Sequence, residues 1–467
     1  MAAWPNFPTV LTTPYEGLLM HLEEISTQTS NMYLDDSGRI VKSVSNICTR
    51  SSLAETHILL NMSHPNLLRA EEIRLLQKEN GCTIQYFFPH LSTFDIESMI
   101  KWPREKVVRL CYQILDVLAF LQEHGIYHGD IKVDNMLLDP DGNAVLIDFG
   151  IMFYCFNDNT VYATQSFPDD GESEFLTKIA DNYDKLATAM FSLGVLFLHI
   201  LIPGEEIPDM SEYEIIKKAT FDPNSFVDSW IPDSTGIEHI VGVIKRLIGP
   251  IVSRPKTFVE LLDPSFVRQQ GRCRSSPLRS DIGSVPEDVF QTALNYIYDV
   301  VITCGNILTV YELAVEIFLH FYTDIAPSIN NIGDYIDICV HLAQMTCFEH
   351  RLVSVSPHLN HIMVDMMTRA NFNFHIPLRT VEWGQKASLC WIYSLTHPSA
   401  WKNDLLKEVE QICTKVDIPI EPSVDTNLPL WMGRFLRELP SLASQMSDVL
   451  IMLNNIPGCI KFGLEIL

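Results

Sequence analysis

The segment HGDIKVDN, residues 128–135, and the triplet DFG, residues 148–150, decide how this chain is interpreted. An apolar run, AVLI at residues 144–147, precedes the triplet and is typical of a short strand. Carboxylate, amide and lysine side chains on either side of this strand are the groups that hold phosphates and a divalent cation. The stretch is therefore the first candidate for a functional site.

Together, the two motifs resemble the catalytic loop and the following metal-binding triplet of protein kinases, at the spacing of that family. The resemblance implies that Asp130 orients the substrate hydroxyl and accepts its proton, and that Lys132 contacts the transferred phosphate. It also implies that Asn135 and Asp148 ligate Mg²⁺, with ATP as the phosphate donor. Lysine at position 132 indicates Ser/Thr substrates.

Upstream, Lys42 resembles the strand lysine with which the family grips the α- and β-phosphates of ATP. Glu55 resembles its partner on the following helix, because ETHILL at residues 55–60 and HPN at residues 64–66 match that helix and its exit. A lone Lys and Glu would ordinarily form a solvated surface pair. Their position relative to the HPN triplet favours the functional interpretation.

The nucleotide-covering loop departs from the family pattern. If residues 22–25 are the first strand, Ser26, Gln28 and Asn31 stand where the family has three glycines. Glycine lets the backbone approach phosphates closely, so either side chains such as Ser26 and Gln28 replace those contacts or nucleotide binding is weak. Phe88 lies in the segment that is expected to contact adenine.

Other family positions are also altered. Ala189 stands where an aspartate usually anchors the catalytic loop, and Gly129 stands where many kinases have a phosphate-binding arginine. Arg254 resembles the arginine that pairs with a glutamate ending the activation segment, for which Glu174 is expected and Glu172 is the alternative. Control by a phosphorylated activation loop is therefore not expected.

Length and composition limit the remaining interpretations. A chain of 467 residues with 47% apolar and 19% charged residues fits two to four compact units. A formal charge of -25 argues against a nucleic-acid partner. Eleven cysteines without a CxxC pair fit a reducing compartment, the cytoplasm or the nucleus. The most apolar run, residues 187–203, is short for a membrane span and is expected to be a buried helix.

We expect an α+β bilobal protein-kinase fold followed by an all-α cyclin-box-like domain. The kinase-like part spans residues 15–267, with a small lobe at 15–90 and a large lobe at 91–267. The polar, Ser-rich segment 268–285 has the composition of a linker. The all-α domain spans residues 286–467.

Two stretches of the C-terminal part, residues 309–322 and 337–350, resemble the second and third helices of a cyclin box, and residues 371–377 resemble the exit before its last helix. The resemblance implies an intramolecular partner that docks on the helix carrying Glu55, with Leu53 buried in that contact. The alternative is a generic helical domain whose apolar stripes are its own core.

The sequence thus predicts a Ser/Thr protein kinase that acts on protein substrates and is controlled by its own cyclin-like domain. One alternative is a pseudokinase scaffold that binds partners without efficient transfer. Another is a small-molecule kinase of similar fold.

Overall fold

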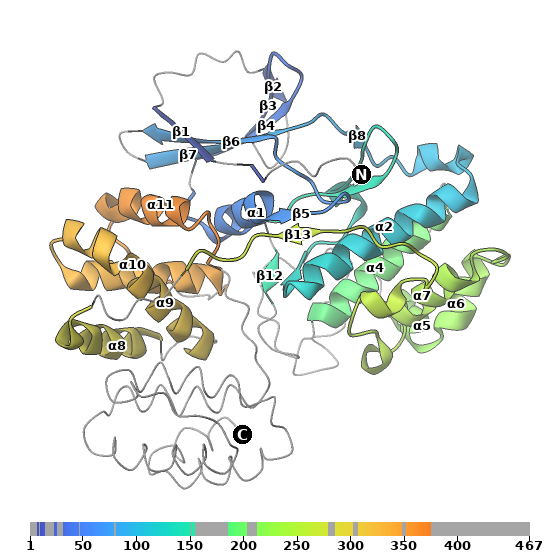
Figure 1. Cartoon of the computed structure of the whole chain (residues 1–467). Helices are drawn as coiled ribbons and strands as arrows, with labels where there is room; N and C mark the ends of the chain where they lie inside the picture. Colours follow the sequence, from blue (N-terminus) through green and yellow to red (C-terminus); the bar gives the residue numbers. More distant parts are fainter. Residues whose placement is uncertain are drawn as a thin grey trace, which may run out of the picture. The chain divides into compact units, whose positions relative to one another are not determined.

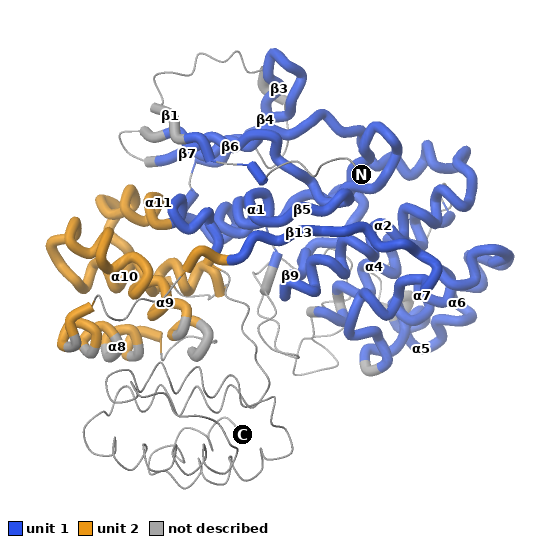
Figure 2. Tube along the Cα trace, viewed as in Figure 1, with its two compact units in different colours: residues 1–155, 161–275, 367–373 blue, residues 156–160, 276–366, 374–467 orange. Residues whose placement is uncertain are grey.

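The computed structural model describes the protein in twelve stretches. These are residues 7–8, 10–14, 23–25, 31–45, 47–78, 81–150, 152–154, 185–202, 213–278, 285–301, 307–347 and 352–374. The chain forms two compact units (Figure 2). Unit 1 comprises residues 1–155, 161–275 and 367–373, and unit 2 comprises residues 156–160, 276–366 and 374–467.

The small lobe of unit 1 contains a sheet of six described strands in the order β1-β6-β7-β4-β3-β2 (Figure 1). The strands are β1 (Val10–Pro14), β2 (Glu23–Ile25), β3 (Asn31–Leu34), β4 (Ile40–Val44), β6 (Glu72–Lys78) and β7 (Gly81–Phe88). β1 runs parallel to β6, and the other neighbours are antiparallel. β1 precedes residue 15, so the sheet begins earlier in the chain than the sequence pattern indicated.

Helix α1 (Arg50–Asn61) follows β4 and is capped by Thr49, whose side chain accepts a hydrogen bond from the Ser52 N–H. A threonine at this position satisfies one of the free N–H groups of the first turn. The hydroxyls of Thr56 and Tyr86 lie 2.6 Å apart and are buried. This contact fastens the middle of α1 to strand β7 of the sheet.

The large lobe is mainly helical. Its described α-helices are α2 (Arg104–Glu123), α4 (Lys185–Leu201), α5 (Tyr213–Phe221), α6 (Pro223–Trp230) and α7 (Glu238–Ile248). α2 ends at Glu123, and Gly125 follows two positions later with a φ of 71°, which suits glycine because it lacks a Cβ. α4 contains residues 187–201 of the apolar run that was predicted to be a buried helix, and Ile200 near its end is 0% exposed.

Short strands bring the two sequence motifs together. β10 (Met136–Leu138) pairs antiparallel with β11 (Ala144–Leu146), so the segments before β10 and after β11 lie side by side. The remaining short strands are β5 (Met62–Ser63), β8 (Ser92–Thr93), β9 (Ile126–Tyr127), β12 (Phe153–Tyr154) and β13 (Arg272–Cys273). β8 also pairs with β10, and β9 pairs with β12.

Part of the segment with linker composition is structured. β13 pairs antiparallel with β5, which directly follows α1, and residues 268–275 belong to unit 1. This pairing was not predictable, because the segment is polar and has no apolar alternation.

The described helices of unit 2 are α8 (Glu287–Val301), α9 (Ile307–Ile325), α10 (Ile332–Thr346) and most of α11 (Asn360–Arg369). α9 contains the first of the two expected stretches, residues 309–322, and α10 contains residues 337–346 of the second, whose last three residues lie outside the described ones. The Tyr335 hydroxyl of α10 donates to the Phe318 carbonyl of α9 at 2.7 Å, which ties their apolar contact together. Among the helices that the structure describes, none is both long and apolar enough to cross a bilayer.

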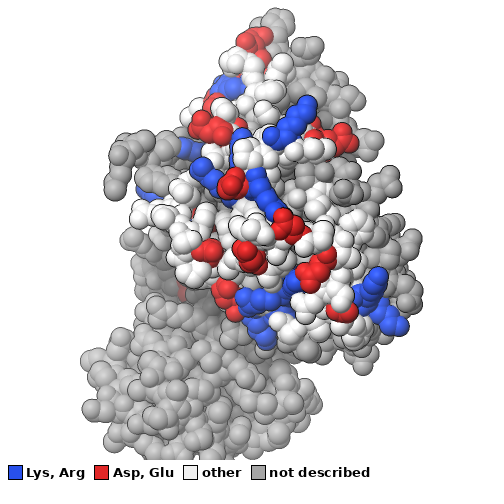
Figure 3. Space-filling view, turned by 90° about the vertical axis from the view of Figure 1, so that its right-hand side faces the viewer, with Lys and Arg blue, Asp and Glu red and all other residues white. Residues whose placement is uncertain are grey.

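Charges are mixed on the face of the molecule shown in Figure 3. Among its described residues, Lys and Arg side chains alternate with Asp and Glu. Positive charge is therefore not gathered into a single patch on that face.

Candidate active site

The structure brings Lys42 and Glu55 together. Lys42 lies on β4, directly opposite Tyr86 of β7, and its Nζ lies 2.7 Å and 2.9 Å from the two carboxylate oxygens of Glu55. Glu55 directly precedes Thr56 on α1, and the Thr56 hydroxyl is hydrogen-bonded to the Tyr86 hydroxyl. Two cross-strand neighbours of the sheet thus bind two consecutive residues of the helix.

The Lys42–Glu55 pair is largely dry, with side chains 17% and 6% exposed. Burial raises the pKa of Glu55 above its ordinary value, Lys42 opposes that rise, and the negative charge of Asp148 adds to it. Asp148 therefore lies near enough to the pair to influence it. A lysine fixed by a carboxylate in a low-dielectric site suits the binding of anionic phosphates.

The residues of the 128–135 segment form a compact cluster around Asp130. The Asn135 Nδ2 donates to both the main-chain oxygen and Oδ2 of Asp130 at 2.8 Å, and Lys132 Nζ lies 2.9 Å from the same Oδ2. Asp130 is 16% exposed and Lys132 is 45% exposed at the side chain. The Asp130 carboxylate is thus fixed in place and reachable by a substrate hydroxyl.

His128 is buried beneath this cluster and hydrogen-bonds to it. It was not named as a site residue from the sequence. Its Nδ1 accepts the Asp130 N–H at 3.3 Å, so its Nε2 carries the proton that is donated to the Ile147 carbonyl at 2.8 Å. Burial lowers the pKa of His128 below its ordinary value, which keeps the ring neutral. His128 joins the Asp130 loop to the strand that leads to Asp148.

Asp148 adopts a left-handed backbone, with φ of 62°, which is uncommon for residues other than glycine. The adjacent Phe149 is buried, and its ring meets the His128 ring edge-on at 5.3 Å. Gly150 lies so close to α1 that a Cβ would stand 2.7 Å from the Ser51 Oγ. The triplet is therefore packed between the catalytic segment and the first turn of α1.

Asn135 and Asp148 supply oxygen donors that fit Mg²⁺. The Nδ2 of Asn135 is committed to Asp130, which leaves its Oδ1 as the free acceptor, and Asp148 Oδ1 receives only a long 3.4 Å contact from the Gly150 N–H. In the described ranges no three His, Cys, Asp or Glu residues gather as a metal site. Mg²⁺ is commonly bound by one or two protein oxygens together with substrate phosphates, and Asn135 and Asp148 would supply such oxygens.

The other predicted site residues are only partly described. Phe88 ends β7 opposite Ile40 and is 5% exposed, so it is buried in the small lobe. Ser26 and Gln28 lie outside the described residues, as do Glu172 and Glu174.

Arg254, the expected partner of those glutamates, is buried. Its Nε donates to the Gly249 carbonyl and its Nη1 to the Ala187 carbonyl, at 2.8 Å and 2.7 Å. It therefore ties the segment after α7 to the first turn of α4.

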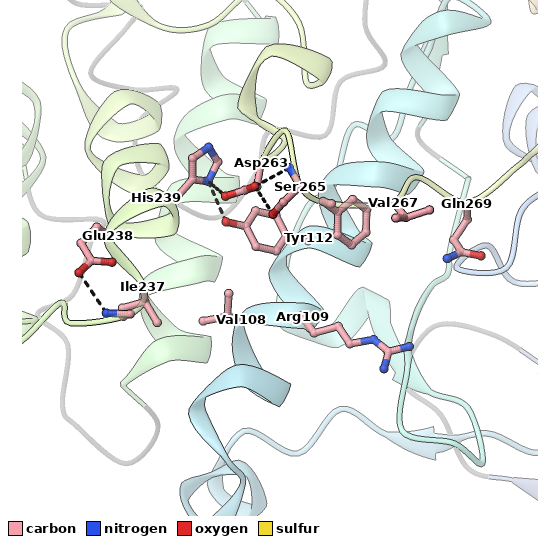
Figure 4. A pocket seen from close by; sticks show the side chains of 12 residues that line it. Val108, Arg109, Tyr112, Ile237, Glu238, His239, Asp263, Ser265, Val267 and Gln269 are labelled. Atoms are coloured by element: carbon pink, nitrogen blue, oxygen red, sulfur yellow. Dashed lines mark hydrogen bonds and ion pairs between the residues drawn. The ribbon is translucent and has the colours of Figure 1, made fainter.

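A pocket of about 550 Å³ lies elsewhere on the large lobe, between α2, α7 and residues 263–269 (Figure 4). The Tyr112 hydroxyl and the His239 Nδ1 are 2.7 Å apart inside it, and Asp263 lies 3.9 Å from the same nitrogen. Burial, with Asp263 nearby, raises the pKa of Tyr112 to about 12. None of the predicted site residues lines this pocket.

Comparisons with known proteins agree with the geometry. A protein-family model described as the protein kinase domain matches residues 39–250. The chain is 26% identical to CBL-interacting serine/threonine-protein kinase 17 of Arabidopsis thaliana over 240 residues, which cover 50% of this chain and 54% of that protein. It is 25% identical to serine/threonine-protein kinase KIN4 of Saccharomyces cerevisiae over 150 residues, which cover 32% and 19%.

The chain is also 26% identical to putative sperm motility kinase W of Mus musculus over 212 residues, which cover 44% of this chain and 39% of that protein. The chain thus spans about half the length or less of these curated relatives. The matched region contains β4, β6, β7 and α1 of the small lobe and the helices of the large lobe, which fits the expected bilobal kinase fold. Residues 39–250 of this chain therefore match the protein kinase domain, and two of the relatives that share this region are named serine/threonine-protein kinases.

Proposed function

We propose that this protein transfers the γ-phosphate of ATP to Ser or Thr hydroxyls of protein substrates. The observation that carries the proposal is the 2.7 Å ion pair between Lys42 and Glu55. A lysine fixed by a buried carboxylate in this way is ready to hold the phosphates of ATP before chemistry begins.

In the proposed reaction, Asp130 orients the substrate hydroxyl and accepts its proton as the new phosphate ester forms. Lys132 is bonded to the same carboxylate and supplies positive charge beside the transferred phosphate. Asn135 and Asp148 hold Mg²⁺, which neutralises phosphate charge when it is bound. Phe88, Ser26 and Gln28 complete the nucleotide site, the first through its backbone.

We also propose that the helical domain controls the kinase domain, as its resemblance to a cyclin box implies. Leu53 of α1 is 4% exposed and remains the residue through which that control is expected to act. Leu59 of the same helix is 1% exposed and provides a matched comparison. If Leu53 has a regulatory role, Leu53→Ala lowers activity more than Leu59→Ala at equal loss of stability.

A transfer assay tests the proposal directly. The full chain is incubated with Mg-ATP and a library of Ser/Thr peptides, next to Asp130→Asn and Asp148→Asn. We expect transfer by the unsubstituted protein and a loss of about 10²- to 10⁴-fold in Asp130→Asn.

Thermal shift separates binding from chemistry. Asp130→Asn should keep a shift with Mg-ATP, and Asp148→Asn should lose the part that depends on metal. No transfer by the unsubstituted protein, in an assay that detects a control kinase, would overturn the proposal. Binding without transfer would identify a pseudokinase instead.

A further inference from the structure

Residues 268–274 form a strap that starts on the large lobe of unit 1. Arg268 Nε donates to Asp116 Oδ1 at 2.8 Å, and the Gln269 N–H donates to Asp116 Oδ2 at 2.7 Å. The other guanidinium nitrogens of Arg268 reach both carboxylate oxygens of Glu123, at 2.5 Å and 3.2 Å. The strap is thus anchored at the buried Asp116, while Glu123, 45% exposed, adds a surface ion pair of little energetic worth.

Asp116 explains why the strap lies here. Its side chain is 0% exposed, and a buried carboxylate is costly unless it is paired and hydrogen-bonded. Burial alone would raise the pKa of Asp116, but His64, Arg268 and the Gln269 N–H together lower it. Two of these three groups come from the strap, so the large lobe depends on it to stabilise a buried charge.

The strap then passes over an aromatic stack. Gly271 lies so close to the Phe120 ring that a Cβ would be 2.2 Å from it. Phe120 in turn stacks on His64, with centroids 5.2 Å apart. A glycine is needed at position 271 for the strap to follow this path.

The end of the strap is fixed to the end of α1. Its strand β13 pairs with β5, and the Arg274 N–H donates to the carbonyl of Asn61, the last residue of α1, at 2.7 Å. The guanidinium of Arg274 also lies over the Phe7 ring at 4.8 Å. The strap therefore connects α2 of the large lobe to the exit of α1 in the small lobe.

A second segment of unit 1 reaches the same residue. Asn61 Nδ2 donates to the Asn371 carbonyl at 2.8 Å, and Asn373 Nδ2 donates to the Arg274 carbonyl at 2.9 Å. The chain leaves unit 1 after residue 275 and returns at residue 367. Residues 371 and 373 of the returning segment are thus hydrogen-bonded to Asn61 and to the strap.

The turn that carries Asn371 is strained. Asn371 and Phe372 have φ values of 51° and 55°, and a bulky aromatic residue rarely adopts this conformation. Phe372 is 1% exposed, and its N–H donates to the Met367 carbonyl at 2.7 Å. Such strain persists where the surroundings hold the backbone firmly, and it is often found at functional positions.

We propose that the strap and Asn61 set the orientation of α1, and thereby the approach of Glu55 to Lys42. Asn61 follows Glu55 by six positions, roughly 9 Å along the helix axis at the usual rise per residue. Arg268 and Asn61 are positioning residues for phosphoryl transfer, a role that rests on the proposed kinase activity.

Hydrogen exchange on the full chain tests the positioning role without needing catalysis. Arg268→Ala removes the anchor on α2, and Arg274→Pro removes the N–H that bonds Asn61. We expect each to speed exchange of the α1 amides by about tenfold while the α7 amides stay unchanged. In kinetics, we expect about a tenfold lower kcat/KM for ATP and an unchanged KM for the peptide.

Two matched variants serve as controls. Glu123→Ala removes the exposed partner of Arg268 and leaves the buried Asp116 contact intact. Ser275→Pro places a proline at the next, exposed position, whose N–H donates to no residue in the described ranges. In both variants, the exchange rates of the α1 amides and kcat/KM for ATP should equal those of the unsubstituted protein. Should Arg268→Ala not fold, Arg274→Pro decides, because it changes no contact of Asp116.

Three results would overturn the proposal: unchanged α1 exchange in Arg274→Pro, equal acceleration in α1 and α7, or control variants that match the test variants. A protein that transfers no phosphate at all would instead refute the proposed function. The exchange of α1 would still decide whether the strap orients the helix.

Discussion

Lys42 and Tyr86 are direct cross-strand partners on β4 and β7, and their side chains bind neighbouring residues of the same helix. Side chains at directly opposite positions of two strands lie on one face of the sheet. The Tyr86–Thr56 contact therefore stands beside the Lys42–Glu55 ion pair and limits the rotation of α1 about its axis.

Tyr86→Phe should lower the free energy of unfolding by about 1 kcal/mol, the usual net worth of a hydrogen bond. Urea unfolding of Tyr86→Phe, Thr56→Val and the double variant measures the coupling between the two hydroxyls. Additive losses would show that the two side chains do not interact.

Glu55→Gln should lower kcat/KM for ATP by about tenfold to 10²-fold, because Lys42 loses its charged partner and its fixed position. Glu72→Gln is the control, since Glu72 also pairs with a cation, Arg74, but lies in β6 away from the cluster. Steady-state kinetics on both variants make the comparison. Equal losses of kcat/KM in the two variants would contradict the role of Glu55 in holding Lys42 for ATP.

Asp148→Gly and Asp148→Ala should differ in stability although both lose the carboxylate. Glycine adopts a φ of 62° readily and alanine does not, so Asp148→Gly should be about 1 kcal/mol more stable. Thermal unfolding without nucleotide measures this difference. Both variants should lack the metal-dependent shift with Mg-ATP, and a shift retained in either would exclude Asp148 as a ligand.

His128 should make stability depend on pH. Burial lowers its pKa below the ordinary 6.5, so the folded protein binds fewer protons than the unfolded chain. The contribution of neutral His128 to the free energy of unfolding is complete above pH 6.5 and is lost as the pH falls through the pKa of His128 in the folded protein. The stability gap between the unsubstituted protein and His128→Phe should thus narrow from pH 7.5 to 5.5 in urea titrations. A gap that widens toward acid pH would contradict the neutral ring.

The segments around Asp130 and Asp148 were predictable because their contacts are local. Asn135 bonds Asp130 five positions earlier, and the short β10–β11 hairpin returns the chain to Asp148. When contacting residues are this close in the sequence, the spacing of a motif is enough to predict that they meet. The Lys42–Glu55 contact, thirteen positions apart, followed from a strand and a helix that were both recognisable.

The strap was missed because its partners are distant in sequence. Arg268 and Asp116 are separated by 152 positions, and polar composition at residues 268–275 is equally typical of a linker. One signal was present: Asp116 stands between Leu115 and Val117 in an otherwise buried stretch of α2. A carboxylate there requires a cation, although the sequence does not say which arginine supplies it.

The parallel pairing of β1 with β6 has a practical consequence for any shortened form of this protein. A piece that begins at residue 15 would lose β1 and expose the hydrogen-bonding edge of β6, whose Ile73 and Leu75 are now buried. Uncovered strand edges recruit other chains. Such a piece should therefore self-associate in solution, whereas the full chain closes that edge with its own N-terminal strand.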